Sequence, residues 1–325
     1  AGALADLVEI HAADPLAGTT HQQPAQPITL GHFLASLGFG LARDADRFLG
    51  ARRRADRCPL GSGALAGSGF SVDRKRLARD LGFTRPAGNA LDAVGDRDAA
   101  QEAAGAAAIL AQRLSRYAEQ FILWTHPAFG WIRFSDRWST GSSMMPQKRN
   151  PDAMELVRGK SATILGRATG LLALTKGLAP SYAKDLQEDK ANLFAALDDT
   201  LLVVRVFRGA LAGMTYHPDR MKSQLPGELL ATDLADRLAA AGVPFRRAHE
   251  RVGRYVTELE EQGLEPGQAP PEMVERHFPE LAGREPPGLE EALAARSVTG
   301  GTAPAAVRAQ AVELRGLLAG LDLPR

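Results

Sequence analysis

The fold is decided by the stretch VRGKSATILGRATGLLALT, residues 157–175. It contains no proline, and its small and apolar residues recur at alternating steps of four and three, which places them on one face of an α-helix. A seam of this kind allows a second helix to approach closely, so we expect a long helix packed against other helices. The residues of the seam are Val157, Ser161, Ile164, Ala168, Leu171 and Thr175.

Long proline-free stretches surround this segment and extend the helical prediction. They cover residues 28–58, 87–126 and 181–217, and several are rich in Ala and Leu, which favour helix. Few windows alternate strictly between apolar and polar residues, and aromatic residues make up only 6%, so strands are weakly indicated. In the last stretch a second apolar face is predicted at Leu193, Leu197, Leu201 and Val204.

The character of the chain changes near Tyr216. The stretch ATDLADRLAAAGVPFR, residues 231–246, predicts shorter helices joined by tight turns, and residues 262–289 are rich in Pro, Gly and Glu. We therefore predict an all-α fold with two domains. A central long-helix bundle domain would cover residues 1–215, and a small C-terminal helical domain would cover residues 216–325.

Composition excludes several classes of protein. The 325 residues carry a formal net charge of +1, which indicates neither a nucleic-acid nor a membrane partner, and no apolar run is long enough to span a bilayer. Cys58 is the only cysteine, so an intrachain disulfide is excluded and a reducing, cytoplasmic location is expected. The glycine-rich run GSGALAGSG, residues 61–69, lacks the GK[ST] of a phosphate loop, and neither a metal nor an organic cofactor is indicated.

The segment STGSSMMPQKRNPD, residues 139–152, is the richest in reactive side chains. Its glycine and prolines prevent a helix from running through it, so it is expected to form a loop. Ser142 is a poor base at its free pKa, but the Lys148 cation and the Asn150 amide follow within eight residues and can gather around a carboxylate. From composition alone, a polar connector without a chemical role is the alternative.

The pattern GSSxMPxKxNP in this segment resembles the signature loop of the fumarase/aspartase superfamily. With Gln147, it is most similar to the loop of the argininosuccinate lyase family. That resemblance implies a helical carbon–nitrogen lyase that needs neither a metal nor an organic cofactor. Further stretches resemble the family in the same order: THQQPAQPITLGH (20–32), PLGSGALAG (59–67), NALDAVGDRD (89–98), YAKDLQEDK (182–190), ATDLADRLAAAGVPFR (231–246) and GGTAP (300–304).

The resemblance also implies roles for the residues that match the family's motifs. Ser142 corresponds to the serine that takes the proton from the carbon beside a carboxylate, and Lys148 to a residue that holds the charge developing there. His21 corresponds to the histidine of the other proton transfer, and Glu155 to the glutamate that raises its basicity. Which of Ser142 and His21 is base and which is acid stays open. Substrate binding is implied for Thr20, Asn150, Tyr182, Gln187 and Lys190.

These roles imply cleavage of argininosuccinate to arginine and fumarate, a reaction of arginine biosynthesis. Ala90, Gly95, Ala99 and Ala183 stand where the family usually has other residues, so a relative acting on another succinyl adduct or amino acid is an alternative. A catalytically silent structural homologue is the non-enzyme alternative.

The family forms homotetramers whose active sites draw on several subunits. We expect the same assembly here, with the seam of residues 157–175 buried by a partner. The family's substrate-gripping N-terminal motif does not occur in these 325 residues. We therefore expect them alone not to be a competent enzyme, and the motif to come from residues beyond this sequence or from a second polypeptide.

Overall fold

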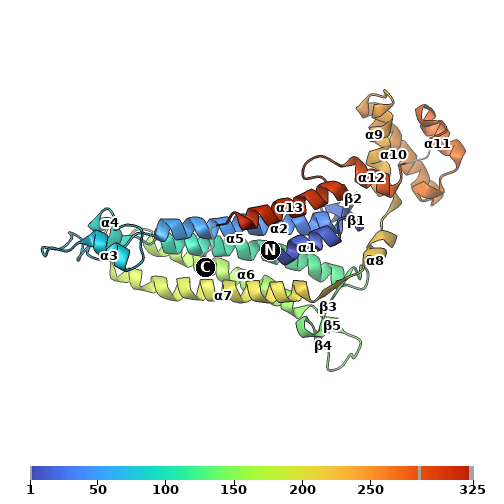
Figure 1. The fold of residues 1–325 in the computed structure, drawn as a ribbon. Coiled ribbons are helices and arrows are strands. Elements are labelled where there is room, and N and C mark those ends of the chain that lie inside the picture. The colour runs from blue at the N-terminus through green and yellow to red at the C-terminus, as the bar shows by residue number, and fades with distance from the viewer. Residues whose placement is uncertain (1, 285–286, 322–325) are drawn as a thin grey trace. The chain divides into compact units, whose positions relative to one another are not determined.

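The structure is a computed structural model that describes residues 2–284 and 287–321. Figure 1 shows that long helices dominate it, and the predicted all-α fold is confirmed. The α-helices are α1 (Gly2–Ile10), α2 (Leu30–Ala55), α3 (Arg74–Asp80), α4 (Ala90–Gly95), α5 (Asp98–Thr125), α6 (Asp152–Thr175), α7 (Asp189–Ala212), α8 (Pro218–Ser223), α9 (Ala231–Ala240), α10 (Phe245–Gln262), α11 (Pro271–His277), α12 (Leu289–Ala295) and α13 (Pro304–Ala319).

Short strands and 3-10 helices complete the described ranges. Each strand belongs to a two-stranded pair, β1 with β2, β3 with β6 and β4 with β5. The strands are β1 (Pro15–Thr20), β2 (Gln23–Thr29), β3 (Ile132–Phe134), β4 (Thr140–Gly141), β5 (Arg149–Asn150) and β6 (Met214–Tyr216), and the 3-10 helices are η1 (Asp136–Trp138), η2 (Lys184–Glu188), η3 (Gly227–Leu230), η4 (Pro266–Gln268) and η5 (Pro279–Leu281).

The contacts between residues divide the chain into two compact units. The first unit joins the residues up to Phe39 with Ala128–Trp131 and Tyr216–Ala319, and the second joins Gly40–Pro127 with Ile132–Thr215. Each unit is described by itself below. The domain boundary predicted between residues 215 and 216 stays a prediction.

The second unit is built on α5, α6 and α7, which lie side by side along most of their lengths (Figure 1). The small side chains of Ala104 and Ala108 on α5 pack against Ala168 and Leu171 on α6, and such small residues let two helix axes approach closely. The side-chain amide of Gln101 also donates hydrogen bonds of 3.1 Å to the Leu171 carbonyl and 2.8 Å to the Thr175 hydroxyl. These contacts make the bundle a rigid support for the loops at its two ends.

The seam of residues 157–175 forms a single helix face, as predicted. Val157, Ile164, Ala168 and Leu171 are buried within one chain, because α5 and α7 already cover this face. The expectation that a partner subunit buries the seam is therefore wrong. Periodicity identifies a buried face, but it does not distinguish a neighbouring helix of the same chain from a helix of another chain.

The buried face of α7 also differs from the prediction. The fully buried residues Ala196, Val203 and Phe207 lie on it, whereas the predicted Leu201 is half exposed. The true face therefore lies about one residue earlier along the helix, which rotates it by about 100°. The buried face of α7 therefore combines the small Ala196 with the larger Val203 and Phe207, and Leu201 lies outside it.

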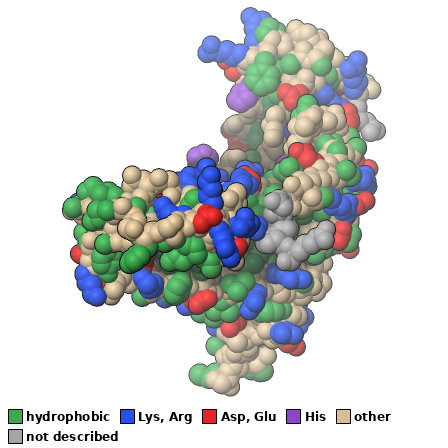
Figure 2. Space-filling view, turned by 60° about the vertical axis from the view of Figure 1, so that its left-hand side comes forward, with side chains coloured by type: hydrophobic (Ala, Val, Ile, Leu, Met, Phe, Trp, Pro, Cys, Tyr) green, Lys and Arg blue, Asp and Glu red, His purple; other side chains and the backbone are tan. Residues whose placement is uncertain are grey.

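The surfaces of α6 and α7 retain several large apolar side chains. Leu165 and Leu172 on α6 and Phe194, Leu201 and Leu202 on α7 are all at least half exposed. Figure 2 shows hydrophobic side chains reaching the surface in groups between Lys and Arg side chains. Exposed apolar groups of this size are typical of surfaces that another protein covers.

The first unit contains a second, separate core. Helices α9, α10 and α11 surround it, and α10 is strongly amphipathic, so one of its faces is buried and the other is charged. The buried residues are Leu234, Ala235, Leu238, Ala248, Val252, Tyr255, Leu259, Met273, Phe278 and Leu281. The same unit holds the β1–β2 hairpin and packs α1 against α13. No described helix combines the length and apolar character required to cross a membrane.

Candidate active site

The loop predicted to carry the chemistry is closed at its base by two short strands. Thr140 pairs with Asn150, and Gly141 with Arg149, in the antiparallel β4–β5 pair. The Arg149 guanidinium also forms an ion pair with the Asp136 carboxylate of η1. The loop between the strands therefore projects from a fixed base, directly ahead of α6.

The Ser142 hydroxyl lies at the start of this loop and is half buried. Its oxygen accepts hydrogen bonds from the backbone N–H groups of Met144, at 3.2 Å, and Met145, at 3.1 Å. The same two dipoles would stabilise the negative charge of a serine alkoxide, because they already point at the oxygen before it ionises. A serine can act as a base only if its alkoxide is stabilised, and these two backbone N–H groups are placed to do so.

Three further predicted residues lie at the same end of the bundle. Lys148 is exposed, and its backbone N–H donates to the Met145 carbonyl at 2.9 Å, which tightens the loop. Asn150 sits in β5, and Glu155 lies exposed in the first turn of α6. The Lys148 cation and the Asn150 amide thus belong to the same loop and its closing strand as the serine, and such a pair of groups could receive a carboxylate.

Thr20 and His21 belong to the other compact unit, at the tip of the β1–β2 hairpin. Thr20 pairs with Gln23, so His21 and Gln22 form a two-residue turn, with φ of 54° and 63° respectively. Positive φ at both positions defines a type I′ turn, which usually requires Asn or Gly because other side chains are strained there. The hairpin thus holds the exposed histidine at a strained tip, an arrangement often found at functional sites. The pairing of His21 with Glu155 stays a prediction.

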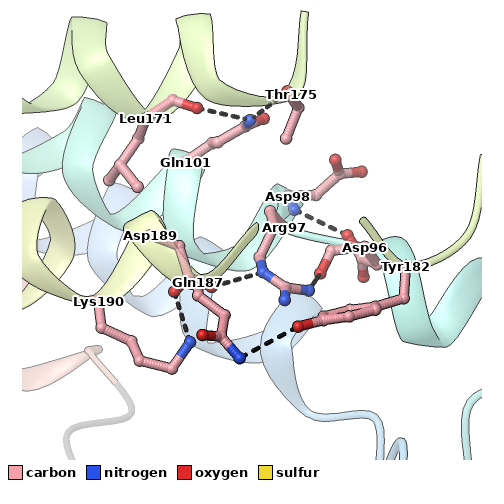
Figure 3. A network of polar contacts seen from close by, with 10 residues as sticks. All are labelled: Asp96, Arg97, Asp98, Gln101, Leu171, Thr175, Tyr182, Gln187, Asp189 and Lys190. Atoms are coloured by element: carbon pink, nitrogen blue, oxygen red, sulfur yellow. Dashed lines mark hydrogen bonds and ion pairs between the residues drawn. The ribbon is translucent and has the colours of Figure 1, made fainter. Parts of the chain in front are cut away.

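The residues predicted to bind substrate form a network at the start of α7, shown in Figure 3. The side-chain amide of Gln187 donates a 3.2 Å hydrogen bond to the Tyr182 hydroxyl. The Lys190 ammonium lies 2.7 Å from Asp189, and Arg97 contacts the other oxygen of that carboxylate at 2.5 Å. Tyr182, Gln187 and Lys190 are exposed, whereas Asp189 is buried. Three substrate-binding candidates are therefore held at one surface.

Asp189 is the charged centre of this network, although no role was predicted for it. Burial alone would raise the pKa of its carboxyl, but hydrogen bonds from Lys190 and Arg97 outweigh burial and hold the pKa below its ordinary value. Asp189 therefore carries a negative charge that fixes the directions of both cations. Its position immediately before Lys190 in the EDK run was the available signal.

The two groups of residues in the second unit lie at opposite ends of α6. Ser142, Lys148 and Asn150 precede its first residue, whereas Tyr182, Gln187 and Lys190 follow its last. A helix of 24 residues is about 36 Å long, so no small molecule can touch both groups of one chain. Figure 1 shows the β4–β5 loop at one end of the bundle and the start of α7 at the other.

Known proteins are similar to this chain in sequence. One family model, described as "Lyase", matches residues 2–166, and another, described as "Argininosuccinate lyase C-terminal", matches residues 228–296. The argininosuccinate lyase of Thiobacillus denitrificans is 46% identical over 319 residues, which cover 97% of this chain and 69% of that protein. The argininosuccinate lyase of Herpetosiphon aurantiacus is 46% identical over 307 residues, which cover 94% and 67%.

A solved structure agrees with these matches. EDDS lyase in complex with formate superposes with a TM-score of 0.88 at 26% identity, covering 98% of this chain and 66% of that one. The helical bundle and its serine loop define a lyase with the fumarase/aspartase type of fold. The sequence identities are more specific, and they show that the chain belongs to the argininosuccinate lyase family. It spans about two thirds of the length of these relatives.

Proposed function

We propose that this protein cleaves argininosuccinate to arginine and fumarate as a cytoplasmic homotetramer whose active sites are shared between subunits. One observation carries the assembly part of the proposal. Two groups of candidate substrate-handling side chains lie at opposite ends of a single bundle, so a complete site requires groups from more than one copy. The bundle domain proposed for residues 1–215 contains every assigned residue.

In the proposed mechanism, Ser142 removes a proton from the carbon beside a substrate carboxylate. That carbon is weakly acidic, so the charge must move onto the carboxylate, where Lys148 and Asn150 receive it. Each preorganised donor of this kind contributes about 3 kcal/mol to transition-state stabilisation. The N–H groups of Met144 and Met145 support the step, because they stabilise the serine oxygen in its charged form.

His21 supplies the other proton, to the nitrogen of the departing guanidinium group. A histidine can do so near neutral pH, and a carboxylate such as Glu155 would raise its basicity once the two side chains meet. The same residues also permit the reverse assignment, with His21 as base and Ser142 as acid. Thr20, Tyr182, Gln187 and Lys190 would hold the remaining polar groups of the substrate.

Fumarate formation tests this proposal most directly. The protein expressed from its complete gene should release fumarate from argininosuccinate, followed by the ultraviolet absorbance of the product. A panel of other succinyl adducts and amino acids would separate argininosuccinate lyase from a relative with another substrate. Absence of fumarate release from every compound would instead support the silent homologue.

Sedimentation velocity tests the assembly part independently. A species of four chains is expected at micromolar concentration, because the exposed leucines of α6 and α7 need a cover. A stable monomer that still cleaves argininosuccinate would contradict shared active sites. A monomer without activity would agree with the proposal that catalysis requires assembly.

A further inference from the structure

The end of α4 lies unusually close to the segment that precedes the substrate-binding network. Gly95 is the last residue of α4, and a Cβ atom added there would lie 2.7 Å from the Ser181 carbonyl oxygen. The carbonyl carbon and backbone nitrogen of Ser181 would lie 3.1 and 3.2 Å away. These atoms belong to the backbone, so a side chain at this position would displace the chain and not merely rotate a neighbour.

The α4 side of this contact is braced. The Asn89 side chain caps the helix by accepting a 3.0 Å hydrogen bond from the Asp92 backbone N–H. Past Gly95, the Asp96 N–H donates to the Asp92 carbonyl at 2.9 Å, and the Asp96 carboxylate accepts from the Asp98 N–H at 2.7 Å. Figure 3 shows the turn of Asp96, Arg97 and Asp98 beside Tyr182.

The Ser181 side of the contact is less constrained. It belongs to the segment between α6 and η2, in which Gly177 has a φ of 83° and Ser181 a φ of 88°. A serine with positive φ is strained and needs its surroundings to hold it. A side chain at position 95 would therefore move this segment, and Tyr182 follows directly after it.

We propose that Gly95 is a positioning residue that sets the substrate fit of the Tyr182–Gln187 pair through its contact with the Ser181 backbone. The inference rests on the proposed function, because it gives Tyr182 and Gln187 the role of substrate binding. The missing side chain lets the segment lie against α4, which places the Tyr182 hydroxyl where Gln187 donates to it at 3.2 Å. Gly95 touches no substrate itself.

The test is the effect of Gly95→Ala and Gly95→Ser on steady-state kinetics in the protein expressed from its complete gene. Both variants should raise KM for argininosuccinate by about tenfold and change kcat by less than about twofold. A displaced binding pair weakens ground-state and transition-state binding alike, whereas the serine loop lies at the other end of the bundle. The relative KM values across a panel of succinyl adducts should change as well.

Gly88→Ala is the matched control. Gly88 lies in the same connecting region and has no heavy atom within 4 Å of an added Cβ, so its kinetics should equal those of the unaltered protein. Helix α4 has no buried residue, so the Gly95 variants should remain folded with circular dichroism spectra like that of Gly88→Ala. Loss of folding would overturn the proposal, because it would make Gly95 a general structural requirement.

The remaining outcomes separate this inference from the proposed function. If the unaltered protein releases no fumarate, the proposed function fails. If the unaltered protein is active and the folded Gly95 variants keep its KM and its substrate preference, the role of Gly95 is wrong. A fall in kcat at unchanged KM would also contradict it, because the contact would then act on the chemical step.

Discussion

The Arg97 guanidinium and the Asp189 carboxylate lie 2.5 Å apart, although 92 residues separate them in the chain. The second oxygen of Asp189 contacts the Lys190 ammonium at 2.7 Å. One buried anion therefore connects the turn before α5 with the first turn of α7, and it leaves the end of Lys190 directed by a fixed charge. The position of the Lys190 ammonium, a candidate substrate-binding group, thus depends on a residue that need not touch the substrate.

Asp189→Asn should weaken both the fold and substrate binding. The amide preserves the shape but not the charge, so Arg97 and Lys190 each lose the carboxylate with which they form an ion pair. We expect the free energy of unfolding to fall by about 1–3 kcal/mol. KM should rise several-fold at similar kcat. Urea denaturation and steady-state kinetics measure the two effects, with Glu188→Gln at the exposed neighbouring position as the control. Equal effects of the two substitutions would contradict this role for Asp189.

The stabilising effect of Asp189 should depend on pH in a defined direction. Its pKa is lowered in the folded protein by Lys190 and Arg97 despite burial, so the unfolded chain takes up the proton first as pH falls. The contribution is therefore complete above the ordinary aspartate pKa of about 4 and is lost as pH falls below it. The difference in unfolding free energy between the protein and Asp189→Asn should stay constant from about pH 7 to pH 5 and shrink below about pH 4. A constant difference at every pH would contradict the depressed pKa.

Ser142→Ala should abolish most of the catalytic activity without unfolding the protein. The substitution removes the hydroxyl oxygen that accepts hydrogen bonds from the Met144 and Met145 N–H groups, and the loss in kcat should be at least about a thousandfold. Ser143→Ala, at the exposed adjacent residue, is the control and should retain activity. Near-normal turnover of Ser142→Ala would remove the serine from the mechanism.

Mixing two inactive variants should restore activity if sites are shared. Ser142→Ala damages one end of the bundle and Gln187→Leu the other, so a site formed from two different chains can contain both intact residues. If equal amounts of the two variants dissociate and reassemble at random, about a quarter of the sites should contain both an unaltered Ser142 and an unaltered Gln187. Fumarate release by the mixture, compared with each variant taken separately through the same treatment, measures the recovery. No recovery in a mixture shown to contain hybrid tetramers would contradict sharing between these two groups.

Adjacent leucines of α6 should differ strongly in their contribution to stability. Leu171 is 1% exposed and packs against Ala104 and Ala108, whereas Leu172 is 57% exposed. Leu171→Ala leaves a cavity between α5 and α6 and should cost about 2–5 kcal/mol of unfolding free energy. Leu172→Ala should change that quantity by less than about 0.5 kcal/mol within one chain. Calorimetry at a concentration where both variants have the same association state makes the comparison, and similar losses would contradict the assigned packing.

The sequence predicted the helical class well because periodicity and proline placement report local structure. The seam from Val157 to Leu171 is a buried helix face, as its spacing indicates. The same spacing could not show which helix covers it, and on α7 the larger side chain of Leu201 suggested a buried face that the smaller Ala196 and Thr200 occupy. Apolar size alone therefore indicates burial poorly, because the buried face of α7 holds Ala196 as well as Phe207.

The site residues were identifiable as motifs, but their arrangement was not. The loop of Ser142 and the network of Lys190 each follow from a short stretch, and the separation between them follows from the length of α6. The positive φ values of His21 and Gln22 could not be predicted from the sequence, because a turn of this type usually contains Asn and Gly. The contacts of Arg97 with Asp189 and of Gly95 with Ser181 join residues far apart in sequence, which a single chain's pattern does not reveal.

The length of α6 also determines how far apart the two groups of candidate residues lie. Its 24 residues separate the Ser142 loop from the surface of Tyr182, Gln187 and Lys190, and in the proposed tetramer both would have to align with complementary ends of neighbouring copies. Inserting four residues would lengthen that distance by about 6 Å and rotate one end relative to the other by about 40°. The neighbouring α5 and α7 would need the same insertion to preserve their contacts with α6. Changes in chain length should therefore be tolerated in the connecting segments and hardly at all within these three helices.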